Sequence, residues 1–358
     1  MKTLTITLHR TDNCGSTLQA YALQHFLNSH GVDNEIIDYV PGYLESKGNL
    51  IKSFLRFLIY GKYIRARKKK FNIFIDENLK VTKRKYKTYL QLKLNYPKAD
   101  CYITGSDQLW NTMYMCGRDP AYYLSFANAR KIAYGVSVAR CPIPIDNLEI
   151  ICRHANNFEW ISTREKSSVM QLTELEISDK EIEHVCDPVL LNPVCVYDKV
   201  KTECLIKEMY ILVYLAQDID IKLLYNLIKK ININNYKVVF AGAYRNKIKC
   251  DYHIRDMGPA EFISLIYNAE YVVSNSYHAT IFSLLYKKQF ATVLPPQNNS
   301  RIMDILEWVR MEDRAITVDN IAFLNDITEE EFCVISEKIN IFSKMSGEKL
   351  IKELMKTL

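Results

Sequence analysis

The strongest constraint on this chain is a strand, helix, strand pattern in its N-terminal part. Residues 4–9 have the composition of a short strand, and residues 16–19 have the Ser-x-x-Gln spacing of a capping box, which starts helices. A broad apolar helical face follows and ends at Gly31, a residue suited to stopping a helix. Residues 35–40 form the next expected strand. Such a unit should have parallel strands joined by a right-handed crossover.

The same alternation continues along the rest of the chain. Further strands are expected at residues 101–104, 131–139, 158–162, 185–191, 209–216, 237–243, 271–274 and 290–294. Helices are expected from residue 218, from 258–259, at 279–288, at 302–309 and over most of 319–358. This rhythm predicts an α/β protein whose parallel sheets are covered by helices on both faces.

The length of 358 residues predicts two domains, because a single core stops growing at roughly 250–300 residues. We expect a Rossmann-like domain at 1–191, a polar linker at 192–208, and a second Rossmann-like domain at 209–358 that ends in helices. Ligands of such folds bind beyond the carboxyl ends of the strands. Two domains of this kind facing each other would form one cleft.

A strongly basic segment at 47–93 interrupts the alternation. It holds 15 Lys or Arg against Asp76 and Glu77, a net charge of +13 in a chain of net charge +6, and its residues 50–60 have a helical apolar face. The plainer interpretation is a solvated helical insertion; the alternative is an anionic partner. We expect no nucleic acid, and peripheral contact with an anionic membrane through 47–93 remains a hypothesis.

The chain has no feature that predicts export or membrane insertion. No apolar run approaches the roughly 18 residues that span a bilayer, and residues 1–9 lack the basic end and apolar block of a signal peptide. We therefore expect a cytoplasmic protein. Any membrane contact would then be peripheral, at the inner face of the cell membrane.

Loops that follow expected strands carry side chains suited to anions or sugar hydroxyls. In the first loop, Asn13, Gly15 and Ser16 lie where a strand enters a helix, so backbone N–H groups and the positive helix end can meet a ligand. The simpler alternative is that Ser16 only caps the helix. The four loops are residues 13–16, 105–108, 162–165 and 275–278.

The second loop places a carboxylate close to an aromatic ring. Ser106 and Asp107 end a strand, and Trp110 follows three residues later. Sugar recognition uses this pairing, since the acid can accept hydroxyl protons while the ring covers C–H surface. The alternative makes Asp107 a loop cap and Trp110 a core residue, and the sequence leaves both open.

Two arginines are candidate anion ligands. Arg164 follows a strand directly, and Arg301 precedes the helical stretch 302–309. A guanidinium binds phosphate or carboxylate through paired hydrogen bonds. For Arg164 the alternative is an ion pair with Glu165, and for Arg301 it is a surface charge at a helix start.

The fourth loop contains His278, whose ring can hold a proton near neutral pH. Asn275 and Ser276 precede it at a strand-to-helix turn, where the helix start favours a bound anion. A histidine in an apolar setting can also be a core residue. Asp218 and Asp220 spell the Asp-x-Asp of metal-dependent enzymes, but at a helix start they serve the helix dipole, so we expect no metal.

Taken in order, these blocks resemble those of one family. The blocks are Asn-Cys-Gly-Ser-Thr-Leu-Gln from 13, Gly-Ser-Asp-Gln-Leu-Trp-Asn from 105, Ser-Thr-Arg-Glu from 162, Asp-Pro-Val-Leu-Leu from 187, Asn-Ser-Tyr-His-Ala-Thr from 275, and Asn-x-Ser-Arg ending at Arg301. The set resembles the polysaccharide pyruvyl transferase family over about residues 4–314. Cys14 stands where the family often has an aromatic residue, and Ala279 where it often has glycine.

The resemblance implies a fold of two Rossmann-like domains like that of GT-B glycosyltransferases, with a cleft between them and no metal or cofactor. It implies phosphoenolpyruvate as donor and a sugar or lipid-linked oligosaccharide as acceptor. It also implies roles for His278 as proton donor or phosphate partner and Asp107 as hydroxyl acceptor. Donor ligands would be Arg164, Asn275, Ser276, His278 and Arg301. Acceptor ligands would be Asn13, Gly15, Ser16, Ser106, Asp107 and Trp110.

Two other functions remain open at the level of the sequence. One is a GT-B glycosyltransferase that uses a nucleotide sugar, which would consume a different donor. The other is a non-catalytic glycan-binding protein that keeps the fold, which would bind glycan without turnover.

Overall fold

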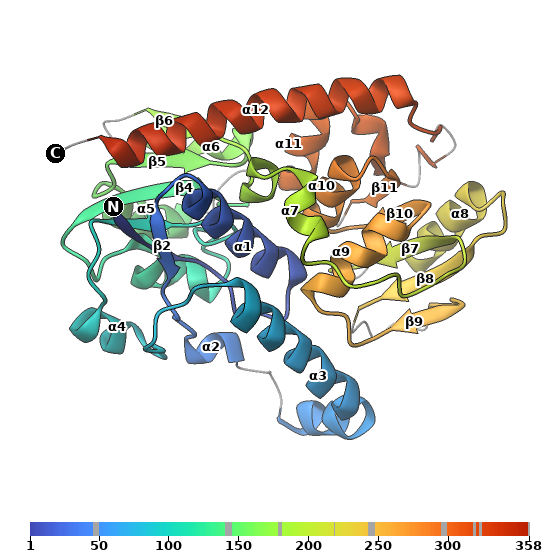
Figure 1. Ribbon diagram of the computed structural model, residues 1–358, viewed down its shortest axis with the longest axis horizontal. Coiled ribbons are helices and arrows are strands. Elements are labelled where there is room, and N and C mark those ends of the chain that lie inside the picture. Colours follow the sequence, from blue (N-terminus) through green and yellow to red (C-terminus); the bar gives the residue numbers. More distant parts are fainter. Residues whose placement is uncertain are drawn as a thin grey trace. The chain divides into compact units, whose positions relative to one another are not determined.

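The structure is a computed structural model that describes residues 1–45, 50–139, 145–177, 181–217, 219–242, 248–294, 299–317, 320–321 and 324–356. The chain divides into two compact units. The first unit contains Met1–Ser53, Ile75–Asn192 and Asn340–Leu358, and the second contains Phe54–Phe74 and Pro193–Ile339. Figure 1 labels most of the helices and strands of both units.

The first unit is built on a parallel sheet of order β2-β1-β3-β4-β5-β6. Strand β3, which lies inside the sheet, is buried at every residue, as expected for a parallel strand covered on both faces. The strands are β1 (Lys2–Ile6), β2 (Asp33–Ile36), β3 (Cys101–Thr104), β4 (Arg130–Val136), β5 (Trp160–Thr163) and β6 (Ile182–His184).

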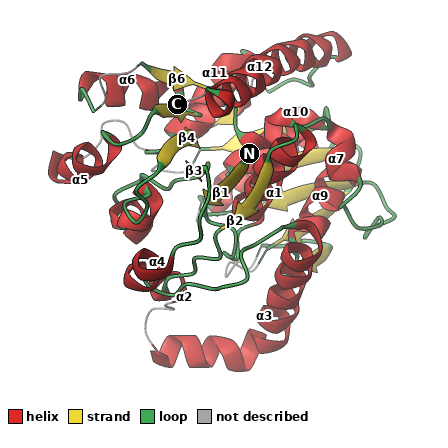
Figure 2. Cartoon of the chain, turned by 60° about the vertical axis from the view of Figure 1, so that its left-hand side comes forward, coloured by secondary structure: helices red, strands yellow, loops and turns green. Residues whose placement is uncertain are grey.

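Helices alternate with these strands along the chain (Figure 2). Helix α1 is buried along most of its length and is followed by Gly31, whose φ of +75° ends the helix as the sequence predicts. The α-helices of this unit are α1 (Cys14–Ser29), α2 (Gly42–Glu45), α4 (Tyr89–Asn95), α5 (Ile145–Ala155) and α6 (Lys166–Glu174). Short 3-10 turns are η1 (Met115–Arg118), η2 (Pro120–Tyr123) and η3 (Pro188–Leu191).

The second unit is built on another parallel sheet, of order β12-β11-β10-β7-β8-β9. Numbered within the unit, this is the 3-2-1-4-5-6 order of the Rossmann fold. The strands are β7 (Tyr210–Tyr214), β8 (Lys237–Ala241), β9 (Tyr252–Ile254), β10 (Tyr271–Ser274), β11 (Gln289–Val293) and β12 (Ala315–Ile316). The other elements are α7 (Val194–Asp198), α8 (Ile221–Ile231), α9 (Pro259–Asn268), α10 (Tyr277–Leu285), α11 (Ser300–Val309) and η4 (Glu312–Arg314). The expected α/β class with parallel sheets is confirmed.

Two helices contribute residues to both units: α3 (Leu50–Asn78) and α12 (Glu329–Met355). Within the described residues, no helix is long and apolar enough to cross a membrane. The expected apolar face at 50–60 falls largely on side chains outside the described part, since only residues from Ile59 onward are covered there.

The domain boundaries expected from the sequence differ from the observed units in two segments. On α3, Lys70 Nζ lies 3.2 Å from Glu261 Oε1, so residues 54–74 group with the second unit. On α12, Ser346 Oγ accepts a hydrogen bond of 2.9 Å from the Cys186 N–H, so the last residues group with the first unit. Within the expected linker at 192–208, the chain also forms α7.

The prediction of a strand at 185–191 is wrong. Residues Pro188–Leu191 form a 3-10 turn instead, capped by Asp187, whose Oδ1 accepts from the Val189 N–H at 3.0 Å. Pro188 has no N–H to donate to a sheet, so it is unsuited to the middle of a strand at 185–191, and the observed strand β6 lies before it and ends at His184. The last strand of the first unit is therefore β6.

Candidate active site

Both sheets have a topological switch point, where the strand order reverses and loops diverge. In the first unit it lies between β1 and β3, and in the second between β7 and β10. Ligands of open α/β sheets bind in the crevice at the carboxyl ends of the strands at such points. Three of the four loops expected to carry chemistry (13–16, 105–108 and 275–278) follow strands at these switch points.

Helix α1 begins three residues earlier than the capping box at 16–19 predicts. Its cap is Asn13, whose Oδ1 accepts from the N–H groups of Gly15 at 2.9 Å and Ser16 at 3.4 Å. These N–H groups, which we expected to face a ligand, are thus bound by the chain's own cap. Ser16 is consequently not the cap but lies in the first helical turn, with its hydroxyl directed elsewhere.

The Ser16 hydroxyl donates to the carboxylate of Asp107 across the switch point. The Oγ to Oδ2 distance is 2.5 Å, and both residues are buried. The other oxygen of Asp107, Oδ1, accepts from the Gln108 N–H at 2.8 Å. The structure therefore brings together two predicted acceptor ligands from distant parts of the chain, in the form of a serine and a carboxylate at hydrogen-bond distance.

The backbone of Asp107 is held in an unusual conformation. Its φ is +90°, a region that side-chain-bearing residues rarely adopt. The Asp107 C=O accepts from the Ser137 N–H at 3.1 Å, which ties the loop to the end of β4. Strain of this kind costs about 1–3 kcal/mol and tends to occur at functional sites. The fold thus maintains the position of this carboxylate at an energetic cost.

Arg164 lies against the same carboxylate but is fully enclosed by protein. Its side chain is 0% exposed, and its Nη1 lies 2.6 Å from Asp187 Oδ2. Its Nη2 lies 3.5 Å from Asp107 Oδ1, and its Nε donates to Glu165 Oε1 at 3.1 Å. Ser106 Oγ accepts from Nη1 at 3.1 Å. One guanidinium is therefore surrounded by three carboxylates.

These contacts change the expected role of Arg164. We expected a clamp for the donor, with the ion pair to Glu165 as the alternative, and that ion pair is present. Because the guanidinium is buried among acids of its own unit, it holds Asp107 and Asp187 in place.

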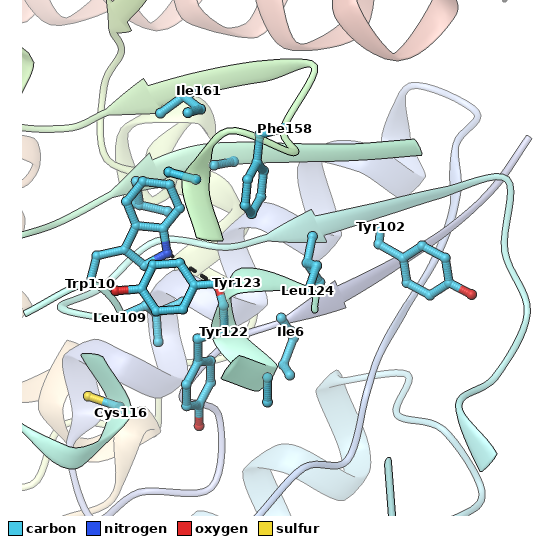
Figure 3. Packing of buried hydrophobic residues seen from close by; sticks show 14 of the residues in the cluster. Ile6, Tyr102, Leu109, Trp110, Cys116, Tyr122, Tyr123, Leu124, Phe158 and Ile161 are labelled. Carbon is cyan, nitrogen blue, oxygen red and sulfur yellow. Dashed lines mark hydrogen bonds between the residues drawn. The ribbon is translucent and has the colours of Figure 1, made fainter. Parts of the chain in front are cut away.

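Trp110 lies in the hydrophobic core of the first unit. Its side chain is 0% exposed, its ring stacks on Tyr123 at 5.2 Å, and its Nε1 donates to the Tyr122 C=O at 3.2 Å (Figure 3). A fully buried ring that packs against Tyr123 and Phe158 offers no face to a sugar. The core alternative is thus the correct one, and the expected acceptor platform at Trp110 is wrong.

Asp187 also belongs to this cluster, although it is not among the site residues that the sequence predicts. Its block, Asp-Pro-Val-Leu-Leu, falls in the segment for which the sequence predicts a strand. The signal available was the Asp-Pro pair, since Asp before Pro favours a turn and leaves the carboxylate at its start.

A second missed group contains His9, Arg10 and Asp38. His9 Nε2 lies 3.2 Å from Asp38 Oδ1, and Arg10 Nε donates to the same oxygen at 2.9 Å. Burial would raise the pKa of Asp38, but the hydrogen bonds from His9 and Arg10 outweigh it, so the pKa of this carboxyl is lowered. This group lies at the ends of β1 and β2 and fixes the chain as it approaches α1.

Replacing Asp38 with asparagine should therefore produce a pH-dependent loss of stability. Because the pKa of Asp38 is lowered in the folded state, its ionised carboxylate stabilises the fold. This stabilisation is fully present above the unfolded-state pKa of about 3.9, and it is lost as the pH falls through the folded-state pKa. We expect Asp38→Asn to lower the free energy of unfolding at neutral pH by on the order of 1 kcal/mol. Urea unfolding at several pH values should show that the difference in free energy of unfolding between wild type and variant becomes smaller below about pH 4. A gap that stays constant or widens there would contradict the assignment.

In the second unit, Asn275 connects the two strands of the switch point. Its Oδ1 accepts from the N–H groups of Ala216 at 2.7 Å and Gln217 at 3.3 Å, and its Nδ2 donates to the Gln217 C=O at 2.8 Å. This amide thus ties the end of β10 to the loop after β7. Ser276 caps α10, with its Oγ accepting from the Ala279 N–H at 3.5 Å. Both residues shape the loop that carries His278.

His278 and Arg301 both lie beside Tyr277, the first residue of α10: His278 follows it in α10, and Arg301 belongs to α11. The His278 ring is 5.3 Å from the Tyr277 ring at an angle of 81°, and the Arg301 guanidinium lies 5.7 Å from the centre of the same ring. His278 is 5% exposed and Arg301 is 9% exposed. The structure therefore brings two predicted donor ligands to one aromatic residue, each in the first turn of its helix.

The predicted site residues fall into two groups, one in each unit. Ser16, Ser106, Asp107 and Arg164 gather in the first unit, and His278 and Arg301 in the second. Among the described residues, no group of three or more His, Cys, Asp or Glu has the arrangement to hold a metal ion. Asp220 caps α8 through the Lys222 N–H at 2.8 Å, and Asp218 lies outside the described residues.

Solved structures with a similar fold include two UDP-GlcNAc 2-epimerases. The enzyme from Methanocaldococcus jannaschii has a TM-score of 0.55 at 13% identity, covering 99% of both chains. That from Neisseria meningitidis, bound to UDP-GlcNAc, has a TM-score of 0.51 at 12% identity, covering 100% of both. The MnaA–UDP structure from S. aureus has a TM-score of 0.55 at 10% identity, covering 99% of this chain and 95% of that one. At these identities the likeness shows the fold alone, a two-domain α/β fold of GT-B type.

Comparison of sequences identifies the family. No curated protein sequence matches the chain significantly. The family model described as polysaccharide pyruvyl transferase matches residues 13–296, most of the chain. That range contains the Ser16–Asp107 pair, Arg164, Asp187 and His278. This chain belongs to the polysaccharide pyruvyl transferase family, a family of transferases.

Proposed function

We propose that this protein transfers the pyruvyl group of phosphoenolpyruvate onto two hydroxyls of a sugar in a bacterial capsular, exopolysaccharide or cell-wall glycan. The acceptor would be a hexose such as galactose, free or in a lipid-linked oligosaccharide. The observation that carries the proposal is the strained, buried Asp107 carboxylate held by Ser16 at the switch point of the first sheet, in a chain of this family. The proposal includes a cytoplasmic location, where phosphoenolpyruvate is produced.

The reaction would form a ketal and release phosphate. A proton adds to the methylene carbon of phosphoenolpyruvate, which becomes a methyl group, and the central carbon becomes an oxocarbenium-like centre. One sugar hydroxyl attacks that carbon and loses its proton. The bond from the central carbon to the phosphate oxygen breaks, phosphate leaves, and the second hydroxyl closes the ring as it loses its own proton. The transfer needs a base, an acid and ligands for the anions.

The residues of the first unit are suited to the base. Asp107 can accept a hydroxyl proton, because a carboxylate is acceptor-only when ionised. Ser16 donates to one of its oxygens and Gln108 N–H to the other, which fixes the direction of the remaining lone pairs. Arg164 holds the carboxylate group at a fixed distance through the 3.5 Å contact. In the proposal, Asp107 is catalytic and Arg164 is a positioning residue.

The residues of the second unit are suited to the donor. A guanidinium and an imidazole can both contact phosphate or carboxylate oxygens, and helix N-termini favour anions. Arg301 and His278 both lie in first turns of helices beside Tyr277. In the proposal, Arg301 binds an anionic group of the donor, and His278 binds its phosphate or supplies the proton.

Replacing His278 with glutamine should separate these two roles. Loss of a charge-assisted hydrogen bond should raise KM for phosphoenolpyruvate by about 10- to 100-fold. If His278 supplies the proton, kcat should fall instead. Steady-state kinetics with His253→Gln as a matched control would measure both, because His253 is a half-buried histidine of the same unit that packs on Phe240. Unchanged kcat and KM in His278→Gln would exclude both roles.

The donor itself is tested by offering alternatives to the purified protein. Phosphoenolpyruvate and a panel of nucleotide sugars would each be incubated with simple galactosides, and consumption of each donor measured. We expect phosphate release from phosphoenolpyruvate that depends on the acceptor. Consumption of a nucleotide sugar alone would instead identify a glycosyltransferase, and glycan binding without any turnover a non-catalytic protein.

A further inference from the structure

Residues 80–98 of the first unit form a surface segment that combines basic charge with two solvent-exposed leucines. The segment holds seven Lys or Arg, and no acidic residue occurs between Glu77 and Asp100. All seven basic residues are exposed. They are Lys80, Lys83, Arg84, Lys85, Lys87, Lys93 and Lys98. Its centre is the short helix α4, teal in Figure 1.

The two leucines lie on the outer face of α4. Leu90 is 63% exposed and Leu94 is 71% exposed, and their spacing of four residues places them on one face. Leu92 lies between them, about 200° around the helix from each, and is fully buried in the core of the first unit. Leu92 thus fixes α4 to the unit, and the opposite face presents the two leucines to solvent.

Most of the charge in this segment is not neutralised locally. Within the described part of the chain, Lys80 forms ion pairs with Asp33 at 2.7 Å and Glu35 at 3.3 Å, and the other six basic residues have no ion pair there. Lys98 instead lies over the Tyr96 ring at 4.1 Å, and Arg84 over the Tyr86 ring at 5.6 Å. Five of these seven positive charges lie close to the two leucines in the sequence, between Lys83 and Lys93.

We infer that α4 and the loops on either side of it, residues 80–98, dock on an anionic lipid surface. The leucines would enter the boundary between headgroups and acyl chains, and the basic residues would meet the headgroup charges. The pairing of exposed aliphatic side chains with basic residues favours lipid over nucleic acid. The phosphate backbone of a nucleic acid binds the basic residues but offers no apolar surface to exposed leucines. This surface is independent of the donor and of the proposed reaction.

Vesicle flotation tests the inference with the full-length protein. Vesicles of phosphatidylcholine alone would be compared with vesicles containing equal parts of phosphatidylcholine and phosphatidylglycerol. Binding should require the anionic lipid and weaken as salt rises. The double variant Leu90→Ser/Leu94→Ser should reduce the partition coefficient at least about tenfold. The variant Lys83→Gln/Arg84→Gln/Lys85→Gln/Lys87→Gln should reduce it by about 100-fold or more.

The control variant is Ile233→Ser, which removes an aliphatic side chain that is 78% exposed but lies outside the segment. It should bind vesicles like wild type. All substituted side chains are exposed, so thermal unfolding should be unchanged in each variant. The inference is overturned if wild type fails to float with anionic vesicles at low salt, or if the leucine variant floats as well as wild type. Retention by single-stranded RNA that is insensitive to the leucine substitutions would overturn it in favour of nucleic acid.

Discussion

Replacing Asp107 with asparagine should lower kcat for pyruvyl transfer by about 10²- to 10⁴-fold, the usual contribution of a general base. Asparagine keeps the size of the side chain and its oxygen acceptor, and it tolerates a positive φ better than most residues. The Ser16 hydroxyl and the Gln108 N–H can therefore still be bound. What is lost is the capacity to take a proton from the acceptor hydroxyl.

The measurement is phosphate release from phosphoenolpyruvate in the presence of acceptor, with thermal unfolding recorded on the same sample. Asp119→Asn is the matched control, because Asp119 is also a buried aspartate of the first unit but accepts from the Tyr39 and Tyr43 hydroxyls at 2.5 and 2.7 Å. That variant should lose stability without a comparable loss of kcat per folded molecule. Turnover of Asp107→Asn within a few-fold of wild type would show that Asp107 is not the base.

Replacing Arg164 with methionine should destabilise the fold by about 3–5 kcal/mol, because removal of one partner from a buried ion pair leaves the other charges uncompensated. Here three carboxylates, those of Asp107, Glu165 and Asp187, would lose their shared cation. Methionine has a similar length and leaves little empty volume. The loss should therefore arise from charge and not from packing.

Chemical denaturation would measure this loss, and two further variants make the result specific. Arg153→Met removes an exposed arginine that pairs with Glu149 and should cost less than about 1 kcal/mol. Adding Asp187→Asn to Arg164→Met should restore part of the stability, because one of the uncompensated charges is then gone. A cost for Arg164→Met as small as that for Arg153→Met would show that the acids do not depend on this guanidinium.

The sequence predicted the strand and helix rhythm well because parallel strands buried on both faces have continuous apolar runs. The expected strand at 101–104 coincides with β3, and that at 271–274 with β10. It also placed Ser16 and Asp107 in loops that follow strands, and the sheet topology then brought these loops together. Long-range contact of this kind follows from strand order, which the alternation alone does not determine.

The sequence failed where a role depends on the direction of a side chain. Arg164 and Trp110 both follow strands, but the first points into a cluster of acids and the second into the core. The position of a residue after a strand does not show whether its side chain points into the protein or toward a ligand. The observed units also differ from the expected domains at 54–74 and 340–358, since a helix expected from the sequence carries no sign of which sheet it packs against.

The central claim is that the central carbon of phosphoenolpyruvate becomes a ketal carbon of the glycan. It is tested most directly by NMR of the product formed from carbon-13-labelled phosphoenolpyruvate in deuterated water. The account predicts a labelled ketal carbon bonded to two sugar oxygens and to a methyl group that has gained one deuterium from the solvent. A labelled carbon that keeps its double bond as an enol ether, or an acceptor that carries no label while the enzyme consumes another donor, would contradict it.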